Sequence, residues 1–312
     1  MVQEEGFRIM IFVDVLSGGV SGGTSIMYAA LGETVSERAG VINLGTEGCM
    51  LMGAFAGFAV TSMTGSPWLG MLAAAAAGGA LALIHAILVV SRKANQFASG
   101  LSLLFLALGL TALYGSGYVG QKINAFDPIA IPGLSSIPIV GPIFFEQNIL
   151  TYISYFVAPL MWFVIFRTRI GLMLRTAGER SEVLTVNGYS VVKVRYIAVV
   201  TGGIFAGIGG AYLSVAYSQS WFENMIIGRG FIAVALVVFA AWDPLKVIGG
   251  AYLFGSALAL SPVLQANGYE INQFALDMLP FVLTLLLLVF LGKRAVNSSP
   301  AELRRVFDNA RA

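Results

Sequence analysis

The sequence predicts an all-α polytopic membrane protein. Of its 312 residues, 57% are hydrophobic and only 11% are charged, whereas a soluble globular domain carries about 25% charged residues. Charged residues are absent from five runs of 20 to 44 positions, at 48–91, 94–121, 147–166, 196–222 and 247–269. A helix that crosses a bilayer needs about 20 apolar residues. Each run therefore accommodates one span, and the first run accommodates two, joined at a Gly-Ser-Pro turn.

We expect about nine spans, at roughly 10–31, 41–61, 68–90, 97–118, 149–166, 195–217, 228–242, 247–265 and 274–292. The second span should be broken near its start, because segment 40–48 combines three glycines with polar Asn43 and Glu47. The seventh has a charge-free core of only 13 residues and also fits a re-entrant hairpin. No charged segment with a cleavage site precedes the first span, so we expect this span to be retained.

The distribution of Lys and Arg predicts the orientation. If the seventh segment spans, one side of the membrane receives fifteen basic residues, and the other receives only Arg8, Lys122 and Arg229. A re-entrant seventh segment would move six of the fifteen to the opposite side. Because basic residues concentrate in cytoplasmic loops, we expect a spanning seventh segment, an outside amino terminus and a cytoplasmic carboxyl terminus.

The loops follow from this topology. We expect a single transmembrane domain, 1–312, without a separate soluble domain. The outer loop 119–148 contains four prolines and is predicted to be extended or turn-rich. The longest inner loop is 167–193. The cytoplasmic tail, 293–312, should include a short amphipathic helix.

Glycine spacing predicts close helix packing. The chain has 37 glycines, and several pairs within the spans lie four residues apart, as in Gly53/Gly57 and Gly203/Gly207. Such spacing lets helix backbones approach closely in lipid. We expect these pairs to pack the bundle internally, in preference to forming a dimerisation face.

No catalytic constellation is present in the sequence. It contains one cysteine, Cys49, and one histidine, His85, and its only Gly-Lys pair is followed by arginine. A zinc site and a phosphate-binding P-loop are therefore excluded. We expect no enzymatic activity, no catalytic residues, no metal site and no cofactor, and we interpret His85 as a hydrogen-bonded packing residue.

Ionisable residues within spans indicate functional sites, because their burial in lipid is costly. Asp14, Glu47 and Asp277 fall within predicted spans. Glu47 lies deepest and shares a helix face with Asn43, one turn earlier. We expect Asn43, Thr46 and Glu47 to line a translocation path. Alternatively, Glu47 pairs with an arginine or caps the helix break.

Three sequence patterns carry a family resemblance. The inner loop reads R-T-R-x-G-L-x-L-R-x-x-G-E at 167–179, and the first inner turn reads S-E-R-x-G-x-x-N-x-G-x-E-G at 36–48. A third pattern joins Glu223-Asn224-Met225 and Gly228–Ala233 to Trp242-Asp243-Pro244. The chain thereby resembles permease subunits of bacterial ABC importers for nucleosides, simple sugars and branched-chain amino acids, and it is most similar to the nucleoside-type branch.

The resemblance implies a transport subunit in the bacterial inner membrane, half of a homodimer or a heterodimer with a second permease. A separate ATPase subunit would dock on the inner loop, which becomes a coupling loop, at Arg175, Ala177, Gly178, Glu179 and Arg180. A substrate-binding protein would contact Glu223 and Arg229 on the outer side. The transported solute would be small and polar, most closely a nucleoside, and nucleic acid would not be a partner.

Two other interpretations stay open from the residues themselves. Intramembrane carboxylates such as Glu47 and Asp277 also suit a secondary transporter driven by an ion gradient. From its residues alone, the inner loop fits a solvated linker as well as it fits a docking site for a partner.

Overall fold

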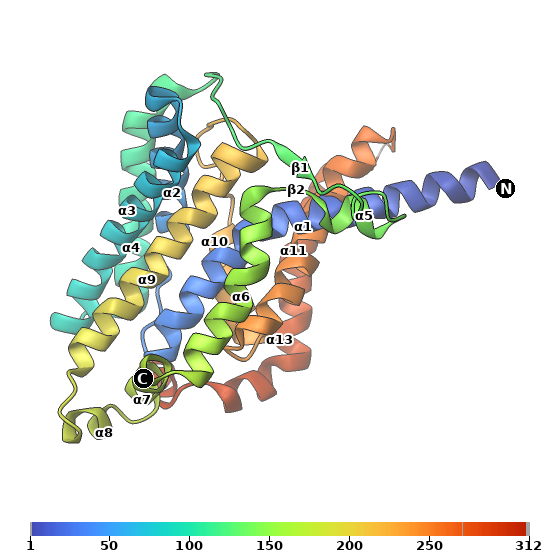
Figure 1. The fold of residues 1–312 in the computed structure, drawn as a ribbon. Coiled ribbons are helices and arrows are strands. Elements are labelled where there is room, and N and C mark those ends of the chain that lie inside the picture. Colours follow the sequence, from blue (N-terminus) through green and yellow to red (C-terminus); the bar gives the residue numbers. More distant parts are fainter. Residues whose placement is uncertain (1, 270, 310–312) are drawn as a thin grey trace.

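Helix α1 (Val2–Arg38) forms the axis of a helical bundle in the computed structural model, which describes residues 2–269 and 271–309. It packs most extensively against α11 (Pro244–Ala266) and α9 (Val191–Ala211). Figure 1 shows its amino-terminal end projecting from the bundle, while its carboxyl-terminal half runs between other helices. The predicted first span, 10–31, is therefore shorter than the helix that forms.

Further helices surround this axis. They are α2 (Thr46–Thr64), α3 (Pro67–Ala86), α4 (Gln96–Gly115), α6 (Ile149–Arg167), α10 (Arg229–Phe239), α12 (Gln273–Asp277) and α13 (Leu279–Ser298). Helices α3 and α9 continue as π-helical turns at Ile87–Ser91 and Tyr212–Tyr217, and α4 continues as a 3₁₀ turn at Ser116–Tyr118. Polar side chains cap several helix starts, as Asn95 does for α4 and Asn148 does for α6.

Six helices of the described part are long and apolar enough to cross a membrane: Ile9–Arg38, Pro67–Ser91, Gln96–Tyr118, Ile149–Arg167, Val191–Tyr217 and Pro244–Ala266. This confirms an all-α polytopic class, and the number nine stays a prediction. Helix α2 begins only at Thr46 instead of residue 41, and Glu47 lies in its first turn. Helix α10 has 11 residues, so it is about 16 Å long, roughly half of a bilayer core.

The proline-rich segment 119–148 is turn-rich. It contains strand β1 (Pro128–Ala130), the short helix α5 (Val140–Phe144) and strand β2 (Glu146–Asn148). The strands pair antiparallel, with Pro128 opposite Asn148. The segment is anchored to α1, because the Ser17 hydroxyl donates to the Pro142 carbonyl at 3.0 Å.

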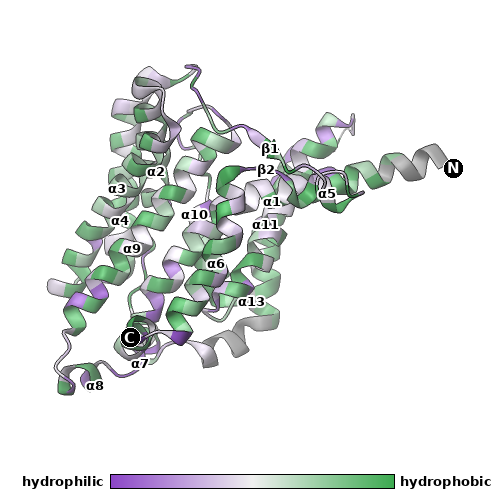
Figure 2. Ribbon diagram, viewed as in Figure 1, coloured by the Kyte–Doolittle hydropathy of each residue, from purple (hydrophilic) through white to green (hydrophobic). Residues whose placement is uncertain are grey.

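The segment between α6 and α9, predicted as the longest inner loop, forms two short helices, α7 (Arg169–Glu179) and α8 (Ser181–Val186). The tail forms helix α14 (Ala301–Asn309). Figure 2 shows predominantly hydrophobic long helices, with hydrophilic colour near the end of α1 and around α7.

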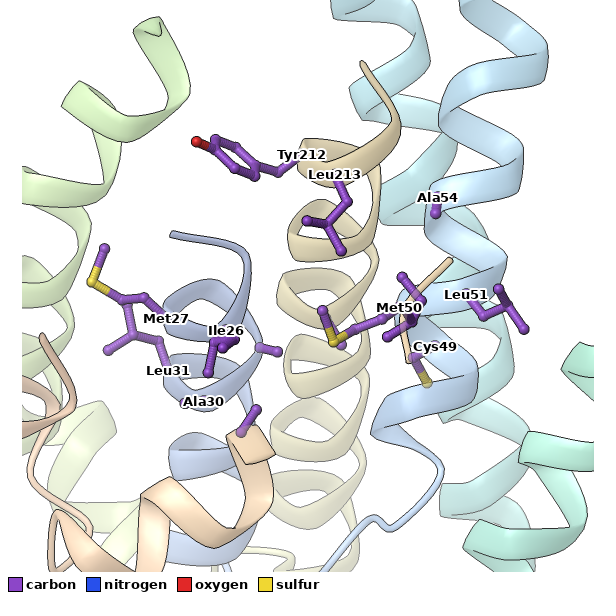
Figure 3. Packing of buried hydrophobic residues seen from close by; sticks show 14 of the residues in the cluster. Ile26, Met27, Ala30, Leu31, Cys49, Met50, Leu51, Ala54, Tyr212 and Leu213 are labelled. Atoms are coloured by element: carbon purple, nitrogen blue, oxygen red, sulfur yellow. The ribbon is translucent and has the colours of Figure 1, made fainter. Parts of the chain in front are cut away.

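Glycines set the closest helix contacts of the core. Gly53 of α2 lies against the backbone of Gly207 on α9, and Gly203 of α9 lies against Gly78 of α3. The predicted internal packing role of these glycines is confirmed. Around them, α1, α2 and the end of α9 pack side chains such as Met27, Met50 and Leu213 (Figure 3).

The glycine contact predicts a stability effect. In Gly53→Ala, the added methyl group would overlap with the Gly207 backbone, and we expect a loss of about 1–3 kcal/mol in unfolding free energy. Gly109→Ala is the matched control, because a Cβ at Gly109 of α4 meets nothing within 4 Å. Thermal unfolding in detergent measures both variants, and equal stabilities would contradict the packing role.

Candidate functional site

The turn between α1 and α2 is held by a buried carboxylate, Glu33. The Asn43 backbone N–H donates to one of its oxygens at 2.7 Å, and the Thr46 hydroxyl donates to the other at 3.0 Å. The Asn43 side-chain oxygen accepts from the Gly45 N–H at 2.9 Å. Glu33 is 1% exposed. The polar groups of the turn are therefore satisfied within the chain, as burial requires.

Side chains from α3 and α4 hold the same turn from the other side. The Ile42 N–H donates to the side-chain oxygen of Gln96 at 2.8 Å, and the Ile42 carbonyl lies 2.9 Å from Nε2 of His85. Since a carbonyl only accepts, Nε2 of His85 carries the proton, and Nδ1 accepts from Ser99 at 3.0 Å. The interpretation of His85 as a hydrogen-bonded packing residue is confirmed.

Glu47 caps the start of α10. Its two carboxylate oxygens accept from the backbone N–H groups of Gly228 at 2.7 Å and Gly230 at 2.6 Å. The first N–H groups of a helix have no partner within the helix and carry partial positive charge. A Cβ at Gly230 would lie 2.5 Å from the Cα of Glu47, so glycine permits this approach.

The turn that follows α10 is held by the end of α1. The Arg38 guanidinium donates to the Trp242 carbonyl at 2.9 and 3.1 Å, and the Trp242 indole N–H donates to Glu37. Ala241 and Trp242 adopt left-handed backbone angles, with φ of 51° and 57°. The motif at 36–48 therefore contacts both the start of α10 and the turn that follows it.

The predicted path residues Asn43, Thr46 and Glu47 are 2%, 2% and 4% exposed. Their polar groups contact the chain itself. Within the described residues Glu47 forms no salt bridge, and of the two alternatives to a path role it fits capping, although the capped helix is α10 instead of its own. Glu33 and Glu37 were missed by the sequence analysis, although their spacing of four residues places them on one helix face.

The two residues predicted to contact an outer binding protein lie in different environments. Glu223 is exposed, whereas Arg229 is half-buried at the start of α10. The Arg229 guanidinium lies 5.7 Å from the centre of the Tyr217 ring. Its backbone adjoins the two N–H groups bound by Glu47. The structure thus brings Arg229 to Glu47, which sequence reasoning had placed near the opposite side of the membrane.

The predicted coupling residues divide between two faces of α7. Ala177 and Gly178 are buried, and a Cβ at Gly178 would overlap with the Arg38 carbonyl. Glu179 and Arg180 are exposed and Arg175 is half-buried. These three line a surface groove of about 300 Å³ together with Leu172, Thr176 and Val183.

Arg195 of α9 links α7 to the ends of α1 and the tail. Its guanidinium donates to the carbonyls of Ala39 at 3.1 Å and Ala177 at 3.2 Å, and it forms a 3.2 Å salt bridge with Glu302 of α14. Arg38 and Arg175 both lie over the Phe166 ring, at 5.2 and 5.5 Å. The described residues contain no group of three or more His, Cys, Asp or Glu that could hold a metal.

The capping contact predicts that Glu47 is needed for stability. Glu47→Gln retains one oxygen acceptor but turns an amide donor toward the α10 start, where only donors are present. We expect a loss of about 1.5–3 kcal/mol in unfolding free energy, measured by thermal unfolding in detergent. The control is Glu146→Gln, whose side chain is exposed. Unchanged stability together with altered transport would instead favour a direct path contact.

The chain is similar in sequence to several transporter permeases. The putative glucose ABC transporter permease protein TsgC13 of Haloferax volcanii is 46% identical over 79% of this chain and 76% of its own. The guanosine ABC transporter permease protein NupQ of Bacillus subtilis is 37% identical over 86% of this chain and 89% of its own. The nucleoside ABC transporter permease protein NupC of Lactococcus lactis is 37% identical over 86% and 90%. Residues 15–291 match the family described as branched-chain amino acid transport system / permease component, and the chain therefore belongs to this family of ABC transporter permeases.

Proposed function

We propose that this chain is the transmembrane subunit of an ATP-driven importer for nucleosides. The contact of α7 with the turn after α1 carries the proposal. It joins the exposed groove along α7 to the buried motif at 36–48, which in turn contacts α10. Two of the three relatives named above act on guanosine or nucleosides. The more similar glucose permease makes a sugar the second candidate solute.

In this proposal an ATPase subunit docks in the groove formed by Leu172, Glu179, Arg180 and neighbouring residues. The groove combines apolar and charged side chains on a short helix, a surface that suits helix recognition by a partner. Displacement of α7 would be transmitted through Gly178 and Ala177 to Arg38 and Ala39. Arg38 in turn binds the Trp242 carbonyl in the turn that follows α10.

We further propose that Asn43, Thr46 and Glu47 shape the path by positioning α2 and α10 around it. Their burial and internal hydrogen bonds support a positioning role over direct solute contact. The same observation disfavours the alternative of an ion-driven transporter at Glu47, because this carboxylate is occupied by two backbone N–H groups.

The proposed assembly contains this chain, a second permease copy or relative, the ATPase and a substrate-binding protein that contacts the outer side around Glu223. The chain would lie in the inner membrane as one domain with nine crossings. Segment 119–148 would face outside, and 167–193 and 293–312 would face the cytoplasm. The seventh crossing would consist of the non-helical segment 218–228 followed by α10, the discontinuous form that transporters use.

The orientation is testable by cysteine labelling in a Cys49→Ala background. A membrane-impermeant maleimide should label Ser136→Cys on intact spheroplasts, because Ser136 is exposed in segment 119–148 and the basic residues concentrate on the other side. Ser298→Cys should be labelled only after the membrane is opened. Labelling of Ser298→Cys on intact spheroplasts would overturn the proposed orientation.

The docking groove is testable by charge reversal. The double variant Glu179→Lys, Arg180→Glu should insert and accumulate normally, since both side chains are exposed, but lose ATP-driven uptake and co-purification of the ATPase. Arg92→Glu is the control, an exposed arginine at the end of α3 outside the groove. Wild-type uptake by the double variant would remove the assignment.

A further inference from the structure

A pocket of about 280 Å³ lies beside the start of α10, between α10, α11 and the junction of α12 with α13. Its apolar lining includes Ile232, Leu258 and Phe281, and its charged residues are Arg229 and Asp277. A largely apolar cavity with a few converging polar groups is the usual form of a small-molecule site.

Arg229 supplies unused hydrogen-bond donors to this pocket. Glu47 already binds the backbone N–H groups at the α10 start, so the helix end itself is satisfied. The Arg229 guanidinium lies over the Tyr217 ring. Within the described part of the chain it forms no hydrogen bond and no salt bridge, although a guanidinium has five N–H donors.

Asp277 supplies the complementary acceptor. It ends α12, and the chain continues into α13 after a break at Met278. Its carboxylate, like the Arg229 guanidinium, has no partner among the described residues. The two opposite charges line one pocket without a salt bridge between them. The Glu47 carboxylate lies beside Arg229, but its oxygens accept from backbone N–H groups, so the Arg229 guanidinium keeps its hydrogen-bond donors for a ligand. The phenyl ring of Phe281, 51% exposed, offers an apolar face beside them.

The location favours a solute site over a structural contact. Residues 228–242 and 274–292 are predicted spans, and unpaired charges within spans are costly and mark solute pathways. The pocket adjoins a discontinuous helix, where transporter binding sites are typically built. Arg229 offers hydrogen-bond donors and Asp277 offers acceptors, which suits an uncharged ligand that carries both.

We propose that Arg229, Asp277 and Phe281 form a weak binding site for a neutral solute with a hydroxyl-bearing sugar ring. Arg229 donates to solute oxygens, Asp277 accepts from ring hydroxyls, and Phe281 packs on the apolar face of the solute. This inference rests on the proposed function and names the solute chemistry of its path. A nucleoside carries a ribose ring and a hexose a larger sugar ring, and both rings bear hydroxyls, so both solutes are tested.

Site-directed labelling tests binding directly. In the complete transporter with Cys49→Ala, Ala257→Cys in the pocket wall is reacted with a small cationic methanethiosulfonate while guanosine or glucose is added in millimolar amounts. We expect one solute to slow labelling about threefold or more, in line with occupancy above its dissociation constant. Protection by guanosine identifies the nucleoside, and protection by glucose identifies the sugar. Protection by neither solute overturns the site.

Uptake measurements separate this site from the proposed function. Asp277→Asn and Arg229→Gln should each lower ATP-driven uptake about tenfold, as loss of a charge-assisted contact predicts. Asp14→Asn is the control, an exposed carboxylate on α1 outside the pocket. Because Asp277 is exposed within this subunit, its variant should fold normally. Wild-type uptake by Asp277→Asn would overturn the site, whereas lack of ATP-driven uptake by the wild-type assembly, with solute protection intact, would contradict the proposed function alone.

Discussion

The hydrogen bonds at the two ends of α10 are the constraint on which the rest of the structure depends. A helix of 11 residues leaves N–H and carbonyl groups unpaired at both ends, and within a membrane such groups cannot turn to water. Glu47 binds the N–H groups at its start, and the N–H groups of Ala240, Ala241 and Trp242 bind its last carbonyls. Arg38 holds this closing turn through the Trp242 carbonyl. Both side chains come from one motif, 36–48. The turn between α1 and α2 must therefore keep a fixed shape, and Glu33, His85 and Gln96 hold that shape.

Close glycine packing is what lets these groups meet. Hydrogen bonds of 2.6–2.7 Å between Glu47 and the α10 backbone need the backbones themselves to approach closely, and Gly230 allows this. The same device recurs between α2 and α9 at Gly53 and Gly207. In lipid, tight van der Waals packing takes over part of the role that the hydrophobic effect has in water. The buried hydrogen bonds therefore depend on the small residues that let the helices approach each other.

The class of fold was predictable because a charge-free run of 20 or more residues satisfies its backbone hydrogen bonds in a bilayer as a spanning helix. The capping role of Glu47 was only partly predictable. Its position in a polar, glycine-rich segment of a predicted span indicated a special role. Its hydrogen-bond partners, however, lie 181 and 183 residues further along the chain. No local sequence pattern reveals a contact over that separation. The outer contact of Arg229 stays a prediction. What the sequence did not reveal is that Arg229 begins a helix only about half as long as a bilayer core is thick and lies beside Glu47. Glu33 and Glu37 were missed since the predicted first span ended before them, although their helical spacing was readable.

Helix α10 connects the two surfaces that matter in the proposed mechanism. At one end, the turn that follows it at Trp242 accepts hydrogen bonds from Arg38, which also adjoins Gly178 of α7 and hence the groove assigned to the ATPase. At the other end, Arg229 enters the pocket assigned to the solute. Hydrogen bonds of defined geometry at both ends resist gradual stretching, and packed interfaces of this kind switch between discrete arrangements. A displacement of α7 that shifts the end of α1 would move Arg38 and therefore either break its contacts with Trp242 or carry α10 with it. In the second case Arg229 moves relative to Asp277, which lies on a separate helix. The solute site would then open or close as a consequence of events at the inner groove, without any residue contacting both.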